Sequence, residues 1–317
     1  MRAALAAEGA DAAVRAARLL SLPVRVPLGT GARLIGSAFA PALGPLRADV
    51  RRGVRRSLGV SGDPPPRAER PGDAFLPPDG MARRVHGDLP SMVVGGLAAL
   101  LLQTLHPLAM AGVAEHSSYK EDPIGRLRRT ASFVGATTFG TVDQANRAIE
   151  DVRRVHRRVH GRAPDGRRYT ANDPDLLTWV HVAEVYSFMA AALRYGPHRF
   201  DTEERDRYFS ETATVARSLG ARWVPETQAE VEEYFTRVRP QLCAGSQALE
   251  ARNFLLRGVA RKLNDRLVYA GILTAAISIL PPFARAELRL PVVPLADDLV
   301  VAPLGRAFCG ILRWTLE

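Results

Sequence analysis

Apolar residues recur at spacings of three and four along most of this 317-residue chain, and no other feature limits its possible folds as strongly. Such spacing puts apolar side chains on one face of an α-helix. The strict alternation of apolar and polar residues that marks a half-buried strand is nearly absent, as are the hairpin turns that would bound it. The sequence therefore predicts an all-α protein.

Capping residues and prolines divide the chain into expected helices. Asp88 is a plausible N-cap for a helix over 90–116, which Pro107 should kink because proline lacks a backbone donor. A turn is expected over 161–169, and a break at Pro281. The other helical segments are expected at 123–140, 141–159, 173–195 and 201–220, just after Pro225, at 245–280 and at 297–316.

Residues 61–80 are dense in proline, glycine and aspartate, so they cannot continue a helix. They are typical of a linker or of a loop that wraps around a folded body. Residues 1–60 have the pattern of an Ala- and Arg-rich amphipathic helix with a break near Pro27. We therefore predict a basic N-terminal helical extension with a Pro-rich linker over 1–80, and a single multi-helix domain over 81–317.

The net charge of +10 suggests a nucleic-acid partner, but its distribution does not support one. All 43 basic residues except Lys120 and Lys262 are arginine, which a GC-rich genome explains more simply than phosphate recognition. Residues 1–70 hold 12 Arg against 5 acids, a net charge of +7 that leaves +3 for the rest of the chain. The body also lacks the interleaved basic and aromatic residues of a single-strand channel. We expect no nucleic-acid partner.

The basic run at residues 47–56 suits an anionic lipid surface or an acidic partner, and its alternative is a solvated helix face. Glu8 and Asp11 interrupt the N-terminal alanine-rich run, which argues against a secretory signal. Cys243 and Cys309 lie far apart and form no metal-binding or disulfide pattern. We expect a cytoplasmic protein with peripheral membrane contact through residues 47–56.

The longest apolar run, 92–102, is too short to span a bilayer, which takes roughly 20 residues, so it should form a buried core helix. His106 follows it within LLLQTLHPLAMAG. Nearly every neighbour is apolar, which predicts a buried ring that needs a hydrogen-bond partner or a metal. A core histidine with a satisfied ring is the alternative to a ligand.

The remaining histidines outside residues 150–160 have simpler interpretations. His86 and His198 flank turns and are expected at the surface. His116 should finish a helix, where its partial charge complements the terminal dipole. His181, between Trp179 and Tyr186, is expected to be a core histidine or to support a site.

His156 and His160 stand four residues apart, on one face of the expected helix. A zinc protease helix would need HExxH, but Arg157 occupies the position of the glutamate. A carboxylate-bridged di-iron bundle would need Glu-x-x-His on two helices, and the sequence has none. One of the two rings could still be the single axial ligand of a haem.

The neighbours of the two rings favour His156 as that ligand. Val152, Val155 and Val159 recur at helical spacing, and His156 lies beside this stripe. His160 precedes a terminal glycine instead. On this argument His156 is the first choice and His160 the fallback.

Arg126 and Thr130, in GRLRRT, are one helical turn apart and share a face. An arginine fork matches a carboxylate such as a haem propionate, and a threonine hydroxyl can donate to dioxygen or to the arginine. The alternative is a surface ion-pair arginine beside a helix-facing threonine.

Five segments, in this order, resemble the catalytic domain of the MpaB/rubber-oxygenase family, which includes latex-clearing proteins and many actinobacterial members. They are ALLLQTLHPLAMAGVAEHS, DPIGRLRRT, VRRVHRRVHG, GRRYTANDPDLLTWVH and ILPPFAR. The resemblance spans about residues 85–290. It implies a globin-like all-α fold carrying haem b, and the use of dioxygen to cleave an isoprenoid or another apolar alkene.

The resemblance also implies roles for particular residues. Arg126 and Thr130 would lie beside the haem, and His156 would be its proximal ligand, with His160 as the fallback. His106 and His181 would line the pocket. The lysine or glutamate that rubber oxygenases use near the haem has no clear match; Arg129 takes the lysine's place by spacing only.

The sequence thus favours a haem-b oxygenase that acts on a lipophilic small molecule inside the cell, because the apparent lack of a secretion signal argues against an extracellular polymer such as rubber. The main alternative is a non-catalytic helical protein that binds a lipid or haem at a membrane surface. A third hypothesis is an iron enzyme that uses His156 and His160 together.

Overall fold

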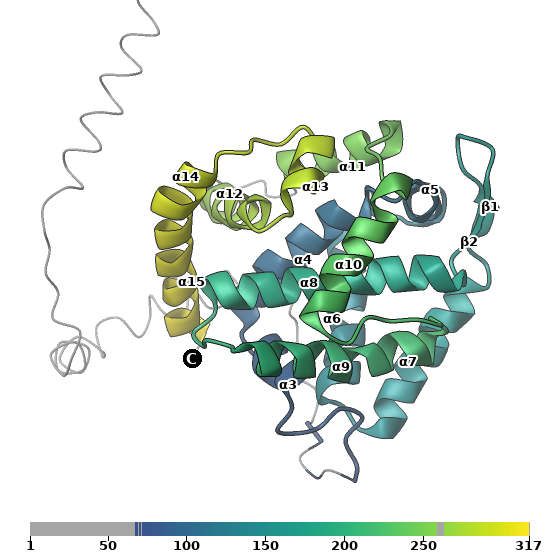
Figure 1. Cartoon of the computed structure of the whole chain (residues 1–317), viewed down its shortest axis with the longest axis horizontal. Helices are drawn as coiled ribbons and strands as arrows, with labels where there is room; N and C mark the ends of the chain where they lie inside the picture. Colours follow the sequence, from purple (N-terminus) through teal and green to yellow (C-terminus); the bar gives the residue numbers. More distant parts are fainter. Residues whose placement is uncertain (1–66, 69, 71, 259–262, 317) are drawn as a thin grey trace, which may run out of the picture. The chain divides into compact units, whose positions relative to one another are not determined.

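The computed structural model describes residues 67–68, 70, 72–258 and 263–316 (Figure 1). In these residues the chain is almost entirely helical, and the strands that pair there form a single two-stranded hairpin. The predicted all-α class is therefore confirmed. The helix expected over 1–60 and the basic run 47–56 lie outside the described residues.

The helices of the first half of the described chain surround one central pair. The central pair is α4 (Leu89–Gln103) and α8 (Pro174–Tyr195). The helices around it are α3 (Met81–His86), α5 (Pro107–His116), α6 (Pro123–Phe139) and α7 (Val142–His156). Helices α4 and α8 have the most extensive contact of any two elements, and most of the core residues gather around them. This pair is the centre of the fold.

The two central helices begin at the residues that their sequences indicate. The Asp88 side chain accepts from Ser91 N at 3.3 Å to cap α4. Asp173 Oδ1 accepts from Asp175 N at 2.8 Å to cap α8. Both caps satisfy donors that the first turn of a helix leaves unpaired, and a proline follows each within two residues, where its missing N–H costs nothing.

Helix α8 is long and apolar enough to cross a membrane by length and composition, as is the bent pair of α4 and α5. In α8, however, 67% of its most apolar window is buried inside the fold. A core helix needs the same composition, and burial accounts for it in α8.

The helix expected over 90–116 is in fact two helices, α4 and α5, bent by 105° at a short break. At the break, backbone carbonyls lose their helical hydrogen bonds and accept hydrogen bonds from other segments of the chain. Trp179 Nε1 donates to Gln103 O at 3.2 Å, and Cys243 N donates to Leu105 O at 2.8 Å. The kink predicted at Pro107 is therefore a complete corner, stabilised by contacts from elsewhere in the chain.

The helix expected to run to Val159 ends at His156, and the expected turn is a β-hairpin. Strand β1 (His160–Arg162) pairs antiparallel with β2 (Arg168–Thr170), with Gly161 opposite Tyr169. Gly166 has a φ of +85°, which allows the tight turn between them. Both strands lie against α5.

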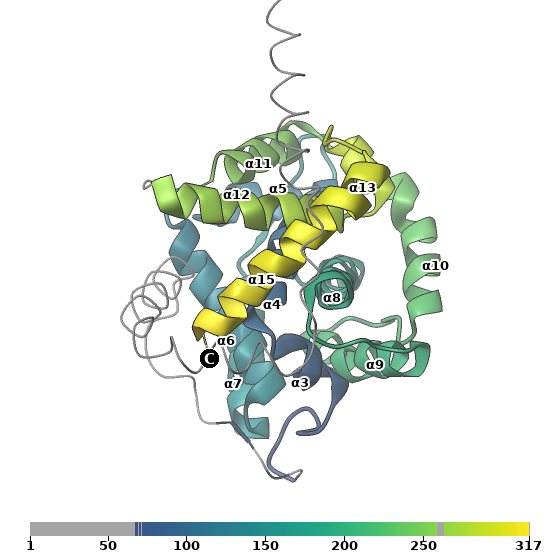
Figure 2. The same cartoon turned by 90° about the vertical axis from the view of Figure 1, so that its left-hand side faces the viewer.

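The second half of the chain adds helices that pack on α8, on α4 or on one another, and it closes with a long C-terminal helical segment. These elements are α9 (Thr202–Leu219), α10 (Gln228–Val238), η1 (Arg239–Gln241), α11 (Ser246–Arg257), α12 (Leu263–Ser278), α13 (Pro282–Glu287), α14 (Pro294–Ala296), η2 (Asp297–Val301) and α15 (Ala302–Leu316). Helix α15 contacts α4, α8 and α12, and it crosses the face that Figure 2 turns toward the viewer.

The described residues before α3 wrap around the body. Ala68 N donates to Phe139 O at 2.8 Å, and Phe75 N donates to Gly140 O at 3.3 Å. Leu76 is buried in the main core. Of the two expectations for residues 61–80, the wrapping loop fits these described residues, while the division of the chain at Met81 stays a prediction.

Candidate functional site

Helix α7 has one buried face, and His156 lies at its C-terminal end. Ala145 and Ile149 are buried, and Val152 and His156 on the same side are half-buried. The Nδ1 atom of His156 is shielded from solvent and has no hydrogen-bond partner among the described residues. Burial lowers the pKa of His156, so the ring is neutral at neutral pH and keeps a lone pair for a ligand.

The valine stripe expected beside His156 is partly wrong. Val155 is 60% exposed, because the buried face of α7 runs through Ile149 and Val152 instead. The fallback His160 is exposed on β1, opposite Thr170. The ring that continues the buried face is therefore His156.

Helix α6 carries Arg126 and Thr130. Arg126 Nη1 donates to Ser117 Oγ at 2.6 Å, and burial lowers the pKa of the guanidinium. Thr130 is exposed, within a run of six consecutive exposed residues, Leu127–Ser132. A packed helix normally buries one side at every turn, but the side chains of this stretch of α6 are exposed all around.

The α6–α7 hairpin brings Arg126 and His156 to the same end. Only Gly140 and Thr141 separate the two helices, which pack along each other. The number of residues from Arg126 to this junction is nearly the same as the number from the junction to His156. Because both helices rise equally per residue, the two residues lie at similar distances from the junction, each near the far end of its helix.

His106 lies at the corner between α4 and α5. Its ring is buried, its centroid is 6.1 Å from that of Trp179, and its Nδ1 has no partner among the described residues. Burial lowers the pKa of His106, Arg167 lowers it further, and a hydrogen bond involving Gln241 raises it. The predicted burial is confirmed.

His181 lies on the opposite side of α8 from Trp179, roughly 200° around the helix. It is buried, with an unpartnered Nε2 among the described residues, and burial lowers its pKa to about 4. Glu184 follows one turn later, and burial raises its pKa to about 7. His106 and His181 therefore occupy different sides of α8, and the structure does not bring them together through that helix.

His86 is not the surface residue that its position beside a turn predicted. Its Nδ1 lies 2.8 Å from Thr138 Oγ1 and its Nε2 lies 2.9 Å from Tyr208 OH. Burial, with a smaller contribution from the nearby His181, lowers the pKa of His86 to about 3. His86 thus joins a buried polar cluster whose members come from α3, α6, α8 and α9.

Sequence reasoning missed most of this cluster, which comprises His86, Thr138, His181, Glu184 and Tyr208. Glu184 could have been found, because a carboxylate inside the apolar run LLTWVHVAEVYSF is an unusual core residue. His86 and Tyr208 gave no local signal. They meet only because α3 packs on α9.

His116 ends α5 as expected, and it also ties that helix to the hairpin. Its Nε2 lies 3.1 Å from Tyr169 OH, which donates to the Glu115 carboxylate. Burial and the Glu115 charge raise the pKa of Tyr169 to about 12. These contacts position the hairpin that follows His156.

The described residues contain no group of three or more His, Cys, Asp or Glu side chains that could hold a metal ion. A surface hollow of about 280 Å³ is lined mainly by charged residues, including Arg84 and Asp201, and the residues predicted for the site are not among its lining. A cofactor held through a single imidazole does not require a multi-ligand cluster.

A family model described as "ER-bound oxygenase mpaB/B′/Rubber oxygenase, catalytic domain" matches residues 83–314, most of the chain. The chain belongs to this family. The mpaB/rubber-oxygenase domain of this protein thus runs from α3 to α15, further than the 85–290 of the predicted resemblance, and it is an oxygenase catalytic domain.

None of the curated proteins and none of the solved structures compared matches the chain. The globin-like arrangement implied by the resemblance therefore stays a prediction, as do the roles of individual residues. The family assignment identifies the reaction class as oxygenation, with dioxygen and a substrate as partners.

Proposed function

We propose that this protein is a haem-b-dependent oxygenase that oxidises or cleaves a carbon–carbon double bond of a lipophilic small molecule, for example an isoprenoid-like one. The observation that supports it best is the His156 ring. It continues the buried face of α7, its Nδ1 has no partner among the described residues, and it lies at the same end of the α6–α7 hairpin as Arg126, in an oxygenase domain.

These residues fit a haem in three respects. His156 offers a neutral imidazole, the form that ligates iron. Arg126 offers a fixed positive charge at the same end of the α6–α7 hairpin, which suits a propionate. The exposed side chains of Leu127 and Thr130 on α6 offer helix surface to a flat ligand.

When bound, haem iron would supply the activation of dioxygen. His156 would hold the iron from one side. The hydrogen bond to Ser117 orients the Arg126 guanidinium, which would bind a propionate or stabilise negative charge that develops during the reaction. Thr130 would donate a hydrogen bond from its exposed hydroxyl, and His106 and His181 would line the pocket.

The decisive experiment is the absorption spectrum of the purified protein reconstituted with haem b. Wild type should show a Soret band. His156→Ala should lose it, because the other described histidine near that end of α7, His160, is exposed. His160→Ala and His198→Ala, both at exposed positions, are matched controls that should keep it. Circular dichroism checks that each variant is folded.

A Soret band that survives in His156→Ala but disappears in His160→Ala would transfer the ligand role to the fallback residue. A wild-type protein that binds iron without porphyrin would support the two-histidine iron enzyme instead. No haem binding by the folded wild type would refute the proposal.

Oxygen consumption distinguishes an oxygenase from a haem carrier. The haem-loaded protein should consume dioxygen only when an apolar alkene is added. Arg126→Gln should keep the Soret band but lower the rate by roughly tenfold or more, equivalent to about 1.4 kcal/mol of lost transition-state stabilisation. Haem binding without alkene-dependent uptake would favour the non-catalytic alternative.

A further inference from the structure

The C-terminal helical segment presents large apolar side chains to solvent. Leu295 is 71% exposed, Leu299 67%, Leu304 62% and Ile311 60%. Val300 and the preceding Val292 and Val293 are exposed as well. Single exposed apolar residues are ordinary, but a group this dense on one segment usually marks an interaction site.

The four most exposed side chains form one row. Elements α14, η2 and α15 follow each other without a gap from Pro294 to Leu316. Leu295 and Leu299 are four residues apart, Leu299 and Leu304 five apart across the wider π-turn, and Ile311 follows two turns later. We call this row the apolar stripe; it runs along α15, which crosses the near face in Figure 2.

The apolar stripe is distinct from the side of α15 that packs into the core. The opposite side of α15 packs into the core through Ala302, Cys309 and Leu312, all of which are buried. Helix α15 therefore packs into the core through one side and, in addition, carries an apolar row whose side chains are exposed in the described part of the chain.

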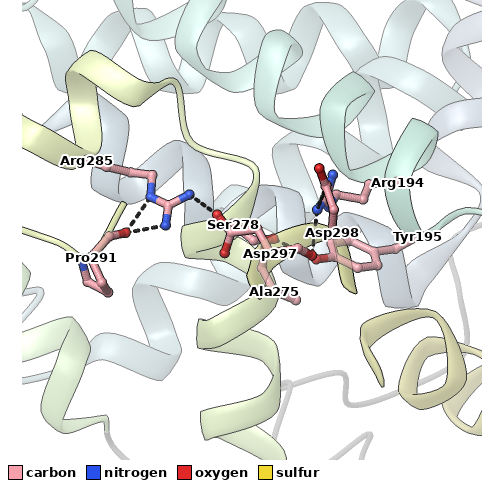
Figure 3. A network of polar contacts seen from close by, with 8 residues as sticks. All are labelled: Arg194, Tyr195, Ala275, Ser278, Arg285, Pro291, Asp297 and Asp298. Carbon is pink, nitrogen blue, oxygen red and sulfur yellow. Dashed lines mark hydrogen bonds and ion pairs between the residues drawn. The ribbon is translucent and has the colours of Figure 1, made fainter. Parts of the chain in front are cut away.

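Ion pairs hold the start of the segment in this orientation (Figure 3). Arg285 forms a buried ion pair with Asp297, and its Nε donates to Pro291 O at 2.7 Å. Arg194 Nη2 donates to Asp298 Oδ1 at 2.8 Å. Asp297 is turned inward, so the leucines on either side of it point outward from a fixed backbone.

The same contacts remove negative charge from the stripe. Both carboxylates of the segment are neutralised by arginines. Arg306 is exposed beside the stripe, and its Nε donates to the backbone carbonyl of Arg194; it forms no ion pair with a carboxylate among the described residues. The local surface therefore combines aliphatic side chains with a cation.

This combination fits a lipid surface better than a protein partner. Binding hot spots between proteins favour Trp, Tyr and Arg, whereas Leu and Val are under-represented in them. A single helix with an aliphatic row and a flanking arginine is the pattern that lies in the plane of a membrane interface, with its cation near anionic headgroups. From this we infer that the apolar stripe docks the protein on the surface of an anionic lipid bilayer. The inference is independent of the haem proposal.

Vesicle sedimentation tests it with the full-length protein. The vesicles are an equal mixture of phosphatidylcholine and phosphatidylglycerol, and wild type should sediment with them. Leu299→Ser/Leu304→Ser should lower the affinity by roughly tenfold or more, because two large apolar side chains no longer leave water. The matched control is Val142→Ser/Leu256→Ser, two exposed apolar residues elsewhere, which should bind like wild type. Unchanged thermal unfolding shows that the variants are folded.

Other occupants of the stripe give different results, and each would overturn the inference. If the stripe joins two copies of the chain, light scattering shows a wild-type dimer that Leu299→Ser/Leu304→Ser converts to a monomer, without vesicle binding. If another basic segment holds the membrane, both double variants bind phosphatidylglycerol vesicles like wild type. If the stripe only packs against another part of this chain, wild type does not sediment with the vesicles.

Discussion

Two titratable residues on α8 respond to the same desolvation in opposite directions. Burial lowers the pKa of His181 to about 4 and raises that of Glu184 to about 7, so in both residues it favours the uncharged form. For His181 the unfolded chain takes up protons first, so stability falls as pH drops below about 6.5. For Glu184 the folded protein keeps the proton to a higher pH than the unfolded chain does, so stability falls as pH rises from about 4.5 to 7.

Replacement of the Glu184 carboxylate by an amide should therefore remove the loss of stability as pH rises. Glu184→Gln should be more stable than wild type at pH 8, by about 1–3 kcal/mol, and the difference should shrink toward pH 5. Urea unfolding at the two pH values measures it. Glu233→Gln, at an exposed position, should show no such change. A pH-independent difference for Glu184→Gln would contradict the desolvation argument.

Residue burial could be predicted where the local sequence decides it. His106 and His181 have apolar neighbours, and both are buried as expected. His86 lies beside charged residues and a turn instead, and its ring is enclosed by Thr138 and Tyr208, which come from distant helices. The sequence could not indicate that environment, because nothing near His86 in the chain is part of it.

At the scale of elements, the most extensive helix contact of the fold, between α4 and α8, depends on one glycine. A Cβ on Gly95 of α4 would lie 2.9 Å from Ser187 O and 2.9 Å from the Phe188 ring of α8. The adjacent Gly96 would place a Cβ 3.8 Å from its nearest neighbour, an ordinary contact. The two glycines look alike in the sequence and differ only in which side of α4 they occupy.

These neighbours give a matched pair of variants. Gly96→Ala should stabilise the protein by about 0.5–1 kcal/mol through helix propensity alone. Gly95→Ala has the same gain but forces α4 and α8 apart, so it should be less stable than Gly96→Ala by about 1–3 kcal/mol. Thermal unfolding of both variants measures the difference. Equal stabilities would mean that the two helices can separate at no cost.

Across the whole molecule, Asp88 joins the start of the domain to its end. Its carboxylate caps α4 and accepts from both Nε and Nη2 of Arg313 in α15, the latter at 2.8 Å. The Asp88 side chain is only 8% exposed, so this ion pair is shielded from water. Arg313 Nη2 also donates to Tyr195 O, so the same contact includes the end of α8.

Two substitutions separate the roles of Asp88. Asp88→Asn keeps a capping oxygen but loses the charge, and should cost about 1–3 kcal/mol. Asp88→Ala also loses the cap and should cost about 0.5–2 kcal/mol more. Urea midpoints measure both. Asp151→Asn, which breaks the exposed pair with Arg154, should change stability by about 1 kcal/mol or less. A similar effect at both sites would show that burial of the Asp88 pair adds nothing.

The sequence alone determined the all-α class, most helix starts, the burial of His106 and His181, and the family resemblance that the match over residues 83–314 confirmed. These follow from spacing and capping, which act over a few residues. Only tertiary structure decided the corner between α4 and α5, the end of α7 at His156, the polar cluster around His86 and the outward apolar stripe. Each of these depends on contacts between segments far apart in the chain, and local spacing carries no information about such contacts.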